Sequence, residues 1–148
     1  MFNRRLLIAG LAAMPFARKA EASEPRVHAP GGLAIAGHDP VAYFREGRPV
    51  KGRAEHAIEW NGATWRFASA ANRAAFANDP DAYAPQFGGY CSYAVSRGYT
   101  ASTDPEAWTV QGGKLYLNYS RNVRAIWSRD MAGNIARGNA NWPGVLSH

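Results

Sequence analysis

Cys91 is the only cysteine in the sequence and its most versatile side chain for chemistry. Residues 92–97 favour a short helix, which Gly98 would end. The sulfur would then lie at a helix N-terminus, where unpaired N–H groups carry partial positive charge and favour the thiolate. A thiolate binds soft metals and attacks disulfides or peroxides. The alternative is an inert, buried thiol, because free cysteine is among the most buried residue types.

The residues that flank Cys91 could form a small binding site. Gly88 and Gly89 precede it, and glycines let a backbone approach a neighbour or a ligand closely. Tyr90 and Tyr93 lie on either side of it, each with an aromatic face and a hydroxyl group. The segment therefore predicts ligand contacts at these two glycines and two tyrosines.

A metal site would need partners for Cys91 from elsewhere in the chain. His38 is the strongest histidine candidate because it directly precedes a presumed helix cap, and Tyr43 offers an unusual oxygen donor. A Cys-His pair suits copper better than structural zinc, which normally takes four protein ligands. No Cys-x-x-Cys or His-x-x-x-His spacing occurs, so the three residues form a hypothesis rather than a motif. The weaker candidates are His28, His56 and His148.

Enzyme signatures are missing from the sequence. No nucleophile elbow, phosphate-cradling glycine loop or dinucleotide fingerprint occurs. A Cys-His nucleophile pair also needs a base within hydrogen-bond reach and a third group that orients the base. The sequence therefore favours a protein that is not an enzyme, and Cys91 would be catalytic only as a redox centre.

Residues 1–22 resemble an export signal. Arg4 and Arg5 precede an apolar run over 6–14, and Ala20-Glu21-Ala22 forms a small-x-small cleavage site. The run is too short to span a bilayer, and the paired arginines favour the twin-arginine route. We therefore expect a periplasmic protein with no stable membrane span after signal removal.

The basic charge of the chain belongs largely to that signal. Residues 1–22 carry four of the 17 basic and one of the 11 acidic residues, so their removal lowers the formal net charge from +6 to +3. The remaining residues have no basic stripe interleaved with aromatics, which is the usual sequence pattern of nucleic-acid binding. The sequence therefore argues against a nucleic-acid partner. An unknown metal or a thiol partner is the expected ligand.

The remaining residues predict one domain. Residues 23–32, rich in Pro, Gly and charge, predict a flexible segment, 33–142 the folded domain and 143–148 a tail. No internal repeat is evident in the sequence. Strands are expected at 33–35, 57–60, 64–68, 107–110 and 114–118. The turns Asn61-Gly62 and Gly112-Gly113 join the last four into two antiparallel hairpins.

The helices are predicted from their caps. Each Asp-Pro pair, at 39–40, 79–80 and 104–105, should open a helical turn, because Asp caps a helix and Pro suits its first position. Ser69 should begin an alanine-rich helix to about Ala77. Ser120 should cap one long C-terminal helix to about Arg137, with an apolar stripe at spacings of three and four. The predicted class is therefore α+β, with short hairpins, several short helices and a long C-terminal helix.

Four segments together resemble the YHS-domain family. They are GHDPVAYF at 37–44, WNGATWRFAS at 60–69, FANDPDAY at 76–83 and GKLYLNY at 113–119. The chain is similar to exported bacterial members of that family, over about 33–142. The resemblance implies a small hairpin-and-helix module linked to the handling of heavy metals, copper above all.

The resemblance also bears on the site residues. Metal-binding relatives carry cysteines at positions that here hold Ala42, Ala68 and Asn72, so the usual metal site of the family is missing. The segment Gly-Gly-Tyr-Cys-x-Tyr-Ala is similar to a subgroup that includes selenoproteins, some with selenocysteine at the position of Cys91. That likeness implies a functional sulfur.

Three functions follow as hypotheses. The first is metal binding or delivery, in which the Cys91 thiolate is the main ligand and His38 or a tyrosine assists. The second makes Cys91 a redox centre with one thiol, resolved by an external thiol. The third is a binding module without catalysis, in which Tyr90, Tyr93 and Tyr99 face a partner or a small ligand.

Overall fold

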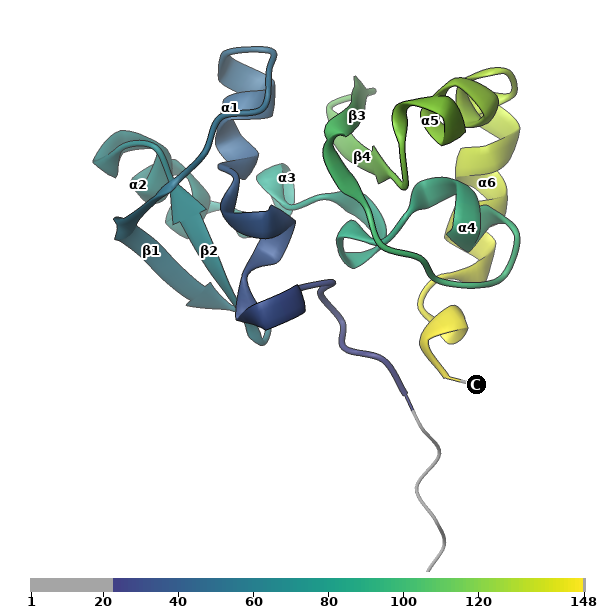
Figure 1. Cartoon of the computed structure of the whole chain (residues 1–148), viewed down its shortest axis with the longest axis horizontal. Coiled ribbons are helices and arrows are strands. Elements are labelled where there is room, and N and C mark those ends of the chain that lie inside the picture. The colour runs from purple at the N-terminus through teal and green to yellow at the C-terminus, as the bar shows by residue number, and fades with distance from the viewer. Residues whose placement is uncertain (1–22, 148) are drawn as a thin grey trace, which may run out of the picture.

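The computed structural model describes residues 23–147, so the predicted export signal lies outside the described residues, as does His148. The chain folds into a single α+β unit that contains two antiparallel β-hairpins and several helices, which confirms the predicted class (Figure 1). None of the helices that the structure describes is long and apolar enough to cross a membrane.

The first half of the unit is built around the hairpin of β1 (Arg53–Trp60) and β2 (Ala63–Phe67), which turns at Asn61-Gly62 as predicted. Helix α2 (Ala70–Asn78) follows it, and its cap at Ser69 is confirmed, since the Ser69 Oγ accepts a hydrogen bond from the Asn72 N–H (3.1 Å). The other elements are η2 (Pro30–Gly32), η3 (Ala34–Gly37), α1 (Pro40–Arg45) and α3 (Pro80–Tyr83).

The second half is built around the hairpin of β3 (Asp104–Gln111) and β4 (Lys114–Asn118). It is followed by α5 (Arg121–Ser128), where the Ser120 Oγ accepts from the Val123 N–H (3.1 Å). The other elements are η4 (Gln86–Gly89), α4 (Ser92–Ser96), α6 (Met131–Asn141) and η5 (Gly144–Leu146).

The two halves repeat one another, although no repeat was evident in the sequence. Each contains a left-handed 3₁₀ turn, a short helix, a hairpin of eight and five residues, and a helix capped by serine. Both hairpins shift register at the same place, between Arg53 and Ala57 and between Asp104 and Trp108. Equivalent residues are 52 positions apart before the hairpin and 51 positions apart from the hairpin onward. We call these halves the first and the second repeat.

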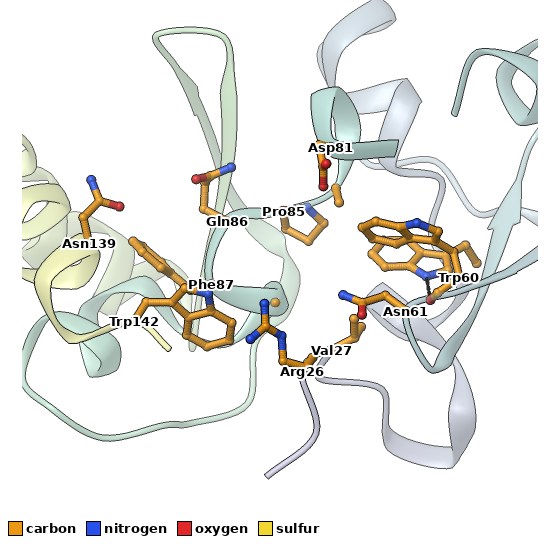
Figure 2. A pocket seen from close by; sticks show the side chains of 13 residues that line it. Arg26, Val27, Trp60, Asn61, Asp81, Pro85, Gln86, Phe87, Asn139 and Trp142 are labelled. Atoms are coloured by element: carbon orange, nitrogen blue, oxygen red, sulfur yellow. Dashed lines mark hydrogen bonds between the residues drawn. The ribbon is translucent and has the colours of Figure 1, made fainter. Parts of the chain in front are cut away.

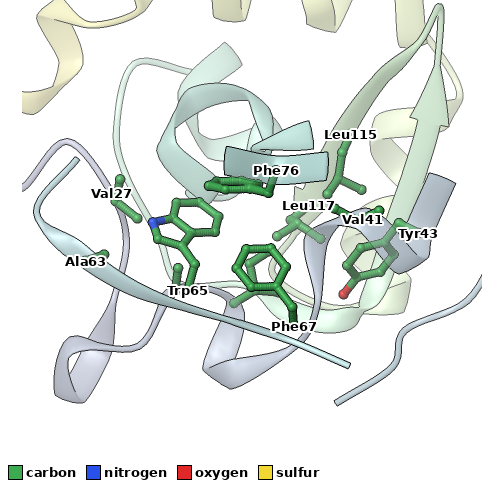
Figure 3. Close-up of a cluster of buried hydrophobic side chains, with 11 residues drawn as sticks. Val27, Val41, Tyr43, Ala63, Trp65, Phe67, Phe76, Leu115 and Leu117 are labelled. Atoms are coloured by element: carbon green, nitrogen blue, oxygen red, sulfur yellow. The ribbon is translucent and has the colours of Figure 1, made fainter. Parts of the chain in front are cut away.

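The apolar core joins the two repeats. Trp65, Phe67 and Phe76 form a cluster in which the Phe76 ring centroid lies 5.1 Å from each of the other two. Leu115 and Leu117 of the second hairpin pack into the same cluster, so the core of the first repeat is completed by the second (Figure 3). A second cluster lies around Phe87, Tyr116 and Trp127 in the second repeat.

Some predicted elements were wrong. Residues 33–35 form no strand, because Ile35 and Ala36 adopt positive φ (53° and 50°) inside the 3₁₀ turn. The Asp-Pro pair at 104–105 begins strand β3 and not a helical turn. There the Asp104 carboxylate accepts a hydrogen bond from the Glu106 N–H (2.9 Å), which is a local turn compatible with the register shift of the strand.

The single long C-terminal helix was also wrong, because the chain leaves helical geometry at Asp130 (φ −139°). The Asp130 carboxylate caps α6 by accepting from the Gly133 N–H (3.2 Å), which starts a new helix. Of the predicted apolar stripe, Trp127 is fully buried whereas Ile126 is 40% exposed.

The segment expected to be flexible, residues 23–32, lies against the folded unit. Val27 belongs to the first core cluster, and the His28 N–H donates to the Gly88 carbonyl (2.8 Å). At its start, the Glu24 N–H donates to the Leu146 carbonyl (2.9 Å), and Leu146 is itself buried. Both ends of the described chain therefore belong to the packed structure.

Gly88 makes this packing possible and can be tested against Gly98. Both have positive φ (64° and 92°), but a Cβ at Gly88 would lie 2.0 Å from the Arg26 carbonyl oxygen, whereas nothing lies within 4 Å at Gly98. Gly88→Ala should lower the unfolding free energy by at least about 3 kcal/mol, and Gly98→Ala by about 1–2 kcal/mol for the backbone alone. Urea unfolding of both variants measures the difference. Equal losses would show that the Arg26 contact does not constrain the fold.

Candidate functional site

Four hydrogen-bond donors surround the buried carboxylate of Asp39, which is fully inaccessible to solvent. Its Oδ1 accepts from the N–H groups of Val41 (2.8 Å) and Ala42 (3.3 Å). Its Oδ2 accepts from the Ala68 N–H and from the Asn72 side-chain amide, both at 2.8 Å. We call this arrangement of donors the first cradle.

The repeat explains how the first cradle is assembled. Asp39 caps α1, so the N–H groups of the first turn of that helix point at its side chain. Ala68 directly follows strand β2, so its N–H arrives from the end of the hairpin. The carboxylate thus joins a helix start to a strand end.

Cys91 occupies the equivalent position in the second repeat. It is the N-cap of α4, as predicted, and its residue is 1% exposed. The Tyr119 N–H, which follows strand β4 as Ala68 follows β2, donates to Sγ (3.3 Å). The N–H groups of Tyr93 and Ala94, in the first turn of α4, act to lower the pKa of the thiol, although neither makes a capping hydrogen bond to the sulfur. These three N–H groups form the second cradle, the counterpart of the backbone donors in the first.

The second cradle differs from the first at one neighbour. Sγ donates a hydrogen bond to the Oδ1 of Asn118 (3.5 Å), and the same oxygen accepts from the Tyr93 N–H (2.9 Å). Asn118 stands where the first repeat has the buried ring of Phe67. A polar side chain therefore lies beside the sulfur at the position where an apolar ring lies in the first repeat.

Burial and the nearby N–H groups shift the pKa of the Cys91 thiol in opposite directions. Burial raises the pKa of the thiol above its ordinary value, while the N–H groups of Ala94, Tyr119 and Tyr93 act to lower it. Because burial is the larger effect, the thiol keeps its proton at neutral pH. The resting sulfur is therefore a weak nucleophile, and the activation expected from the helix N-terminus is not realised in this state.

A cavity of about 270 Å³ has Cys91 in its lining. The residues that line it are Cys91, Tyr93, Ala94, Tyr99, Ala101, Tyr119 and Val123. Tyr99 and Tyr119 expose 50% and 57% of their surface. Val123 is the counterpart of Asn72, whose longer polar side chain contacts the carboxylate in the first repeat. The cavity therefore lies in the second repeat beside Cys91 and Val123, the two residues that correspond to Asp39 and Asn72 in the first repeat.

Two buried polar groups near the sulfur lack a partner among residues 23–147. They are the Nδ2 of Asn118 and the hydroxyl of Ser92, and both residues are fully inaccessible to solvent. An unpaired buried polar group costs about 1–3 kcal/mol. The second cradle therefore has donor capacity that the neutral thiol does not use.

The other predicted metal ligands are not brought to Cys91. The Nδ1 of His38 is hydrogen bonded to the Ile35 carbonyl (3.1 Å). The Tyr43 hydroxyl donates to the Pro105 carbonyl (2.8 Å), and burial raises its pKa. Over residues 23–147 no group of three or more His, Cys, Asp or Glu side chains could hold a metal ion. The hydrogen-bond partners of His38 and Tyr43 in the described residues are thus Ile35 and Pro105, and Cys91 is not one of them.

The predicted ligand contacts divide between two roles. The backbone at Gly88 approaches that of Arg26, and the Tyr90 hydroxyl donates to the Pro25 carbonyl (2.8 Å), so both fix the N-terminal segment. The Gly89 carbonyl accepts from the Thr103 hydroxyl (2.8 Å). Of the four, only Tyr93 lines the cavity at the sulfur, and the Arg97 guanidinium lies 4.9 Å from its ring centroid.

A second cavity, of about 200 Å³, was not predicted from the sequence. Trp60 and Trp142 face it from the first and second repeat, with Arg26 between them (Figure 2). The Arg26 guanidinium lies 6.0 Å from the Trp142 ring centroid. This cavity depends on the packing of the two repeats, for which the sequence carried no signal.

Comparison with known proteins finds a family match in the first repeat. A sequence model of the YHS domain matches residues 41–87, from α1 into η4. No curated protein and no solved structure gives a significant match to the chain. The second repeat, which contains Cys91, lies largely outside the matched region.

Three residues of the matched region, Ala42, Ala68 and Asn72, do not offer ligands to a metal ion. Ala42 and Ala68 have no donor side chain, and both present their backbone N–H to Asp39. The amide of Asn72 is already engaged by Asp39 through its nitrogen and by Arg45 through its oxygen (3.4 Å). The three positions do converge on one point, but a carboxylate occupies that point.

The Asp39 carboxylate should be a major determinant of stability. Asp39→Ala leaves three N–H groups and the Asn72 amide without their acceptor, so the unfolding free energy should fall by at least about 3 kcal/mol. The matched control is Asp79→Ala, since Asp79 also precedes a proline but its side chain accepts no capping hydrogen bond. That variant should lose less than about 1 kcal/mol. Similar losses in urea unfolding would contradict the role given to the first cradle.

Proposed function

We propose that the protein is an exported, periplasmic metal-handling protein that takes a soft monovalent cation, copper(I) being favoured, at Cys91. The match to the YHS domain supports the general class, because that family is often linked to metal handling. The observation that carries the proposal is the cavity of about 270 Å³ with Cys91 in its lining. Soft cations select thiolate ligands.

The surroundings of the sulfur support binding as a thiolate. The incoming cation displaces the thiol proton, which leaves through the cavity to solvent. The Tyr119 N–H, 3.3 Å from Sγ, then donates to a sulfur that carries negative charge, and such hydrogen bonds are stronger than those to a neutral acceptor. The second cradle therefore stabilises the metal-binding form of the side chain.

The number of ligands favours delivery over storage. The hydrogen-bond partners of the sulfur are the Asn118 side chain and the Tyr119 N–H, with no histidine or carboxylate among them in residues 23–147. A single strong ligand leaves the coordination of a soft cation incomplete, so a donor from a partner completes it. The cation is then cargo that passes from one thiol to another.

Copper(I) binding should depend on Cys91 and on pH. Competition with a copper(I) chelator under anaerobic conditions should give one bound equivalent for the full-length protein and none for Cys91→Ser. Because the cation replaces a proton on a thiol with a raised pKa, affinity should rise about tenfold per pH unit from about pH 6 to pH 8. Isothermal competition at several pH values measures both effects.

Two controls separate this site from the set predicted by sequence. His38→Gln and Tyr43→Phe should leave copper(I) affinity unchanged, since neither side chain is a partner of the sulfur. Copper(I) affinity that Cys91→Ser retains, or that does not change with pH, would overturn the proposal.

A second candidate function is the binding of a small uncharged ligand without metal. It is favoured by Tyr99 and Tyr119, which line the cavity and are each exposed over half or more of their surface. Tyrosine rings exposed at a concave surface offer stacking faces with a polar end. In this case Cys91 serves as part of the wall, and its replacement by serine has little effect on binding.

A further inference from the structure

We propose that Cys91 is a site of oxidation, and that its sulfinate form is held in the second cradle as the Asp39 carboxylate is held in the first. The oxidant is hydrogen peroxide or a small organic hydroperoxide. This inference concerns the metal-free protein and does not depend on the proposed function.

The two repeats supply the argument from geometry. A sulfinate, Cβ–SO₂⁻, has two oxygens and one negative charge on the group after Cβ, as an aspartate carboxylate does. The carboxylate of Asp39 accepts from residues two and three positions after it and from the residue after strand β2. The N–H groups at the same three positions relative to Cys91 belong to Tyr93, Ala94 and Tyr119, and of these the Tyr119 N–H already donates to Sγ. The chain therefore already shows that this arrangement of donors binds a two-oxygen anion.

The side chain of Asn118 provides a second, independent observation that points to oxidation of the Cys91 sulfur. Its Oδ1 contacts Sγ, while its Nδ2 is buried and has no acceptor among the described residues. On oxidation the Tyr93 N–H passes from Asn118 to a sulfinate oxygen, as the Val41 N–H donates to Asp39. The freed amide of Asn118 rotates and donates its Nδ2 to the other oxygen. The unused donor is satisfied only in the oxidised state.

The chemistry proceeds in two balanced steps. The Cys91 thiolate attacks one oxygen of hydrogen peroxide; the S–O bond forms, the O–O bond breaks, and after proton transfer the products are sulfenic acid and hydroxide, which solvent protonates to water. A second hydrogen peroxide oxidises the sulfenic acid in the same way, giving water and a sulfinic acid that releases its proton to solvent. Cys91 lies in the lining of the cavity with Tyr99 and Tyr119, and that cavity is large enough for an oxidant of this size.

Two features direct the reaction to the sulfinate. The sequence has a single cysteine, so a sulfenic acid at position 91 has no internal thiol with which to form a disulfide. The two oxygens of the Asp39 carboxylate accept all four hydrogen bonds of the first cradle. The third oxygen of a sulfonate at Cys91 would therefore have no equivalent in the first repeat. The second cradle therefore favours two oxygens and no more.

Peptide mass spectrometry tests the inference. The full-length protein is treated with hydrogen peroxide in excess over several hours at about pH 8 and digested with trypsin. The peptide 74–97 contains Cys91 and has no methionine or tryptophan, so its mass reports on the sulfur. The expected product gains two oxygens (about 32 Da), and the protein keeps its circular dichroism spectrum and its unfolding temperature. An unmodified peptide, a gain of three oxygens (about 48 Da) or loss of the fold would overturn the inference.

The matched variant is Asn118→Asp, which preserves shape and acceptors for the thiol but places a carboxylate beside the sulfinate. It should lose most of the sulfinate product, and equal yields in the variant and the parent would contradict the role of the Asn118 amide. Should the variant not fold, amide NMR of the parent decides the matter. The Tyr93 and Tyr119 N–H signals must shift downfield on oxidation, and unchanged signals would exclude the second cradle as the binding place.

Discussion

The fold depends on backbone N–H groups that converge on a single buried side chain in each repeat. The residue occupies the N-cap position of a short helix, and its side chain accepts the N–H of the residue after the second strand of the hairpin. In the first repeat this acceptor is Asp39, and in the second it is Cys91. Such donors cannot be left unpaired in the interior without a cost of about 1–3 kcal/mol each, so each position requires an acceptor.

The two repeats use the same constraint differently. Asp39 is fixed by four hydrogen bonds, one from the Asn72 side chain, and no open space is needed beside it. The Cys91 thiol is neutral, and its sulfur is larger than a carboxylate oxygen of Asp39. A cavity lined by Val123 lies beside it. The first repeat therefore stabilises the unit, while the second keeps a position whose charge and occupant can change. The shared core makes the chemistry of one repeat depend on the stability of the other.

Local signals predicted much of the fold. The turns at Asn61-Gly62 and Gly112-Gly113, and the caps at Ser69 and Ser120, act within a few residues and were confirmed. Features that depend on packing were not predictable. Ile35 and Phe87 adopt positive φ inside 3₁₀ turns, although neither residue type favours it, because the turns are held by the rest of each repeat. The apolar stripe predicted one continuous helix, but the Asp130 side chain caps a new helix and so interrupts it.

The candidate site was predictable in part. Cys91 as a helix cap followed from the sequence, but its Asn118 neighbour is 27 positions away, and its burial and raised pKa depend on such distant residues. His38 and Tyr43 were chosen by residue type, and only tertiary structure could show that their partners are Ile35 and Pro105. The repeat itself was not visible because few side chains are shared between the halves. What both halves preserve is backbone geometry, which many different side chains can adopt.

The central claim is that the second cradle is suited to hold an anion at position 91. The most direct test compares Cys91→Asp with its neutral isostere Cys91→Asn in urea unfolding between about pH 4 and pH 8. The account predicts that the aspartate variant is at least as stable as the asparagine variant at neutral pH and loses that advantage as acid protonates its carboxylate. An aspartate variant that is several kcal/mol less stable at neutral pH, as for a charge buried without donors, would contradict it.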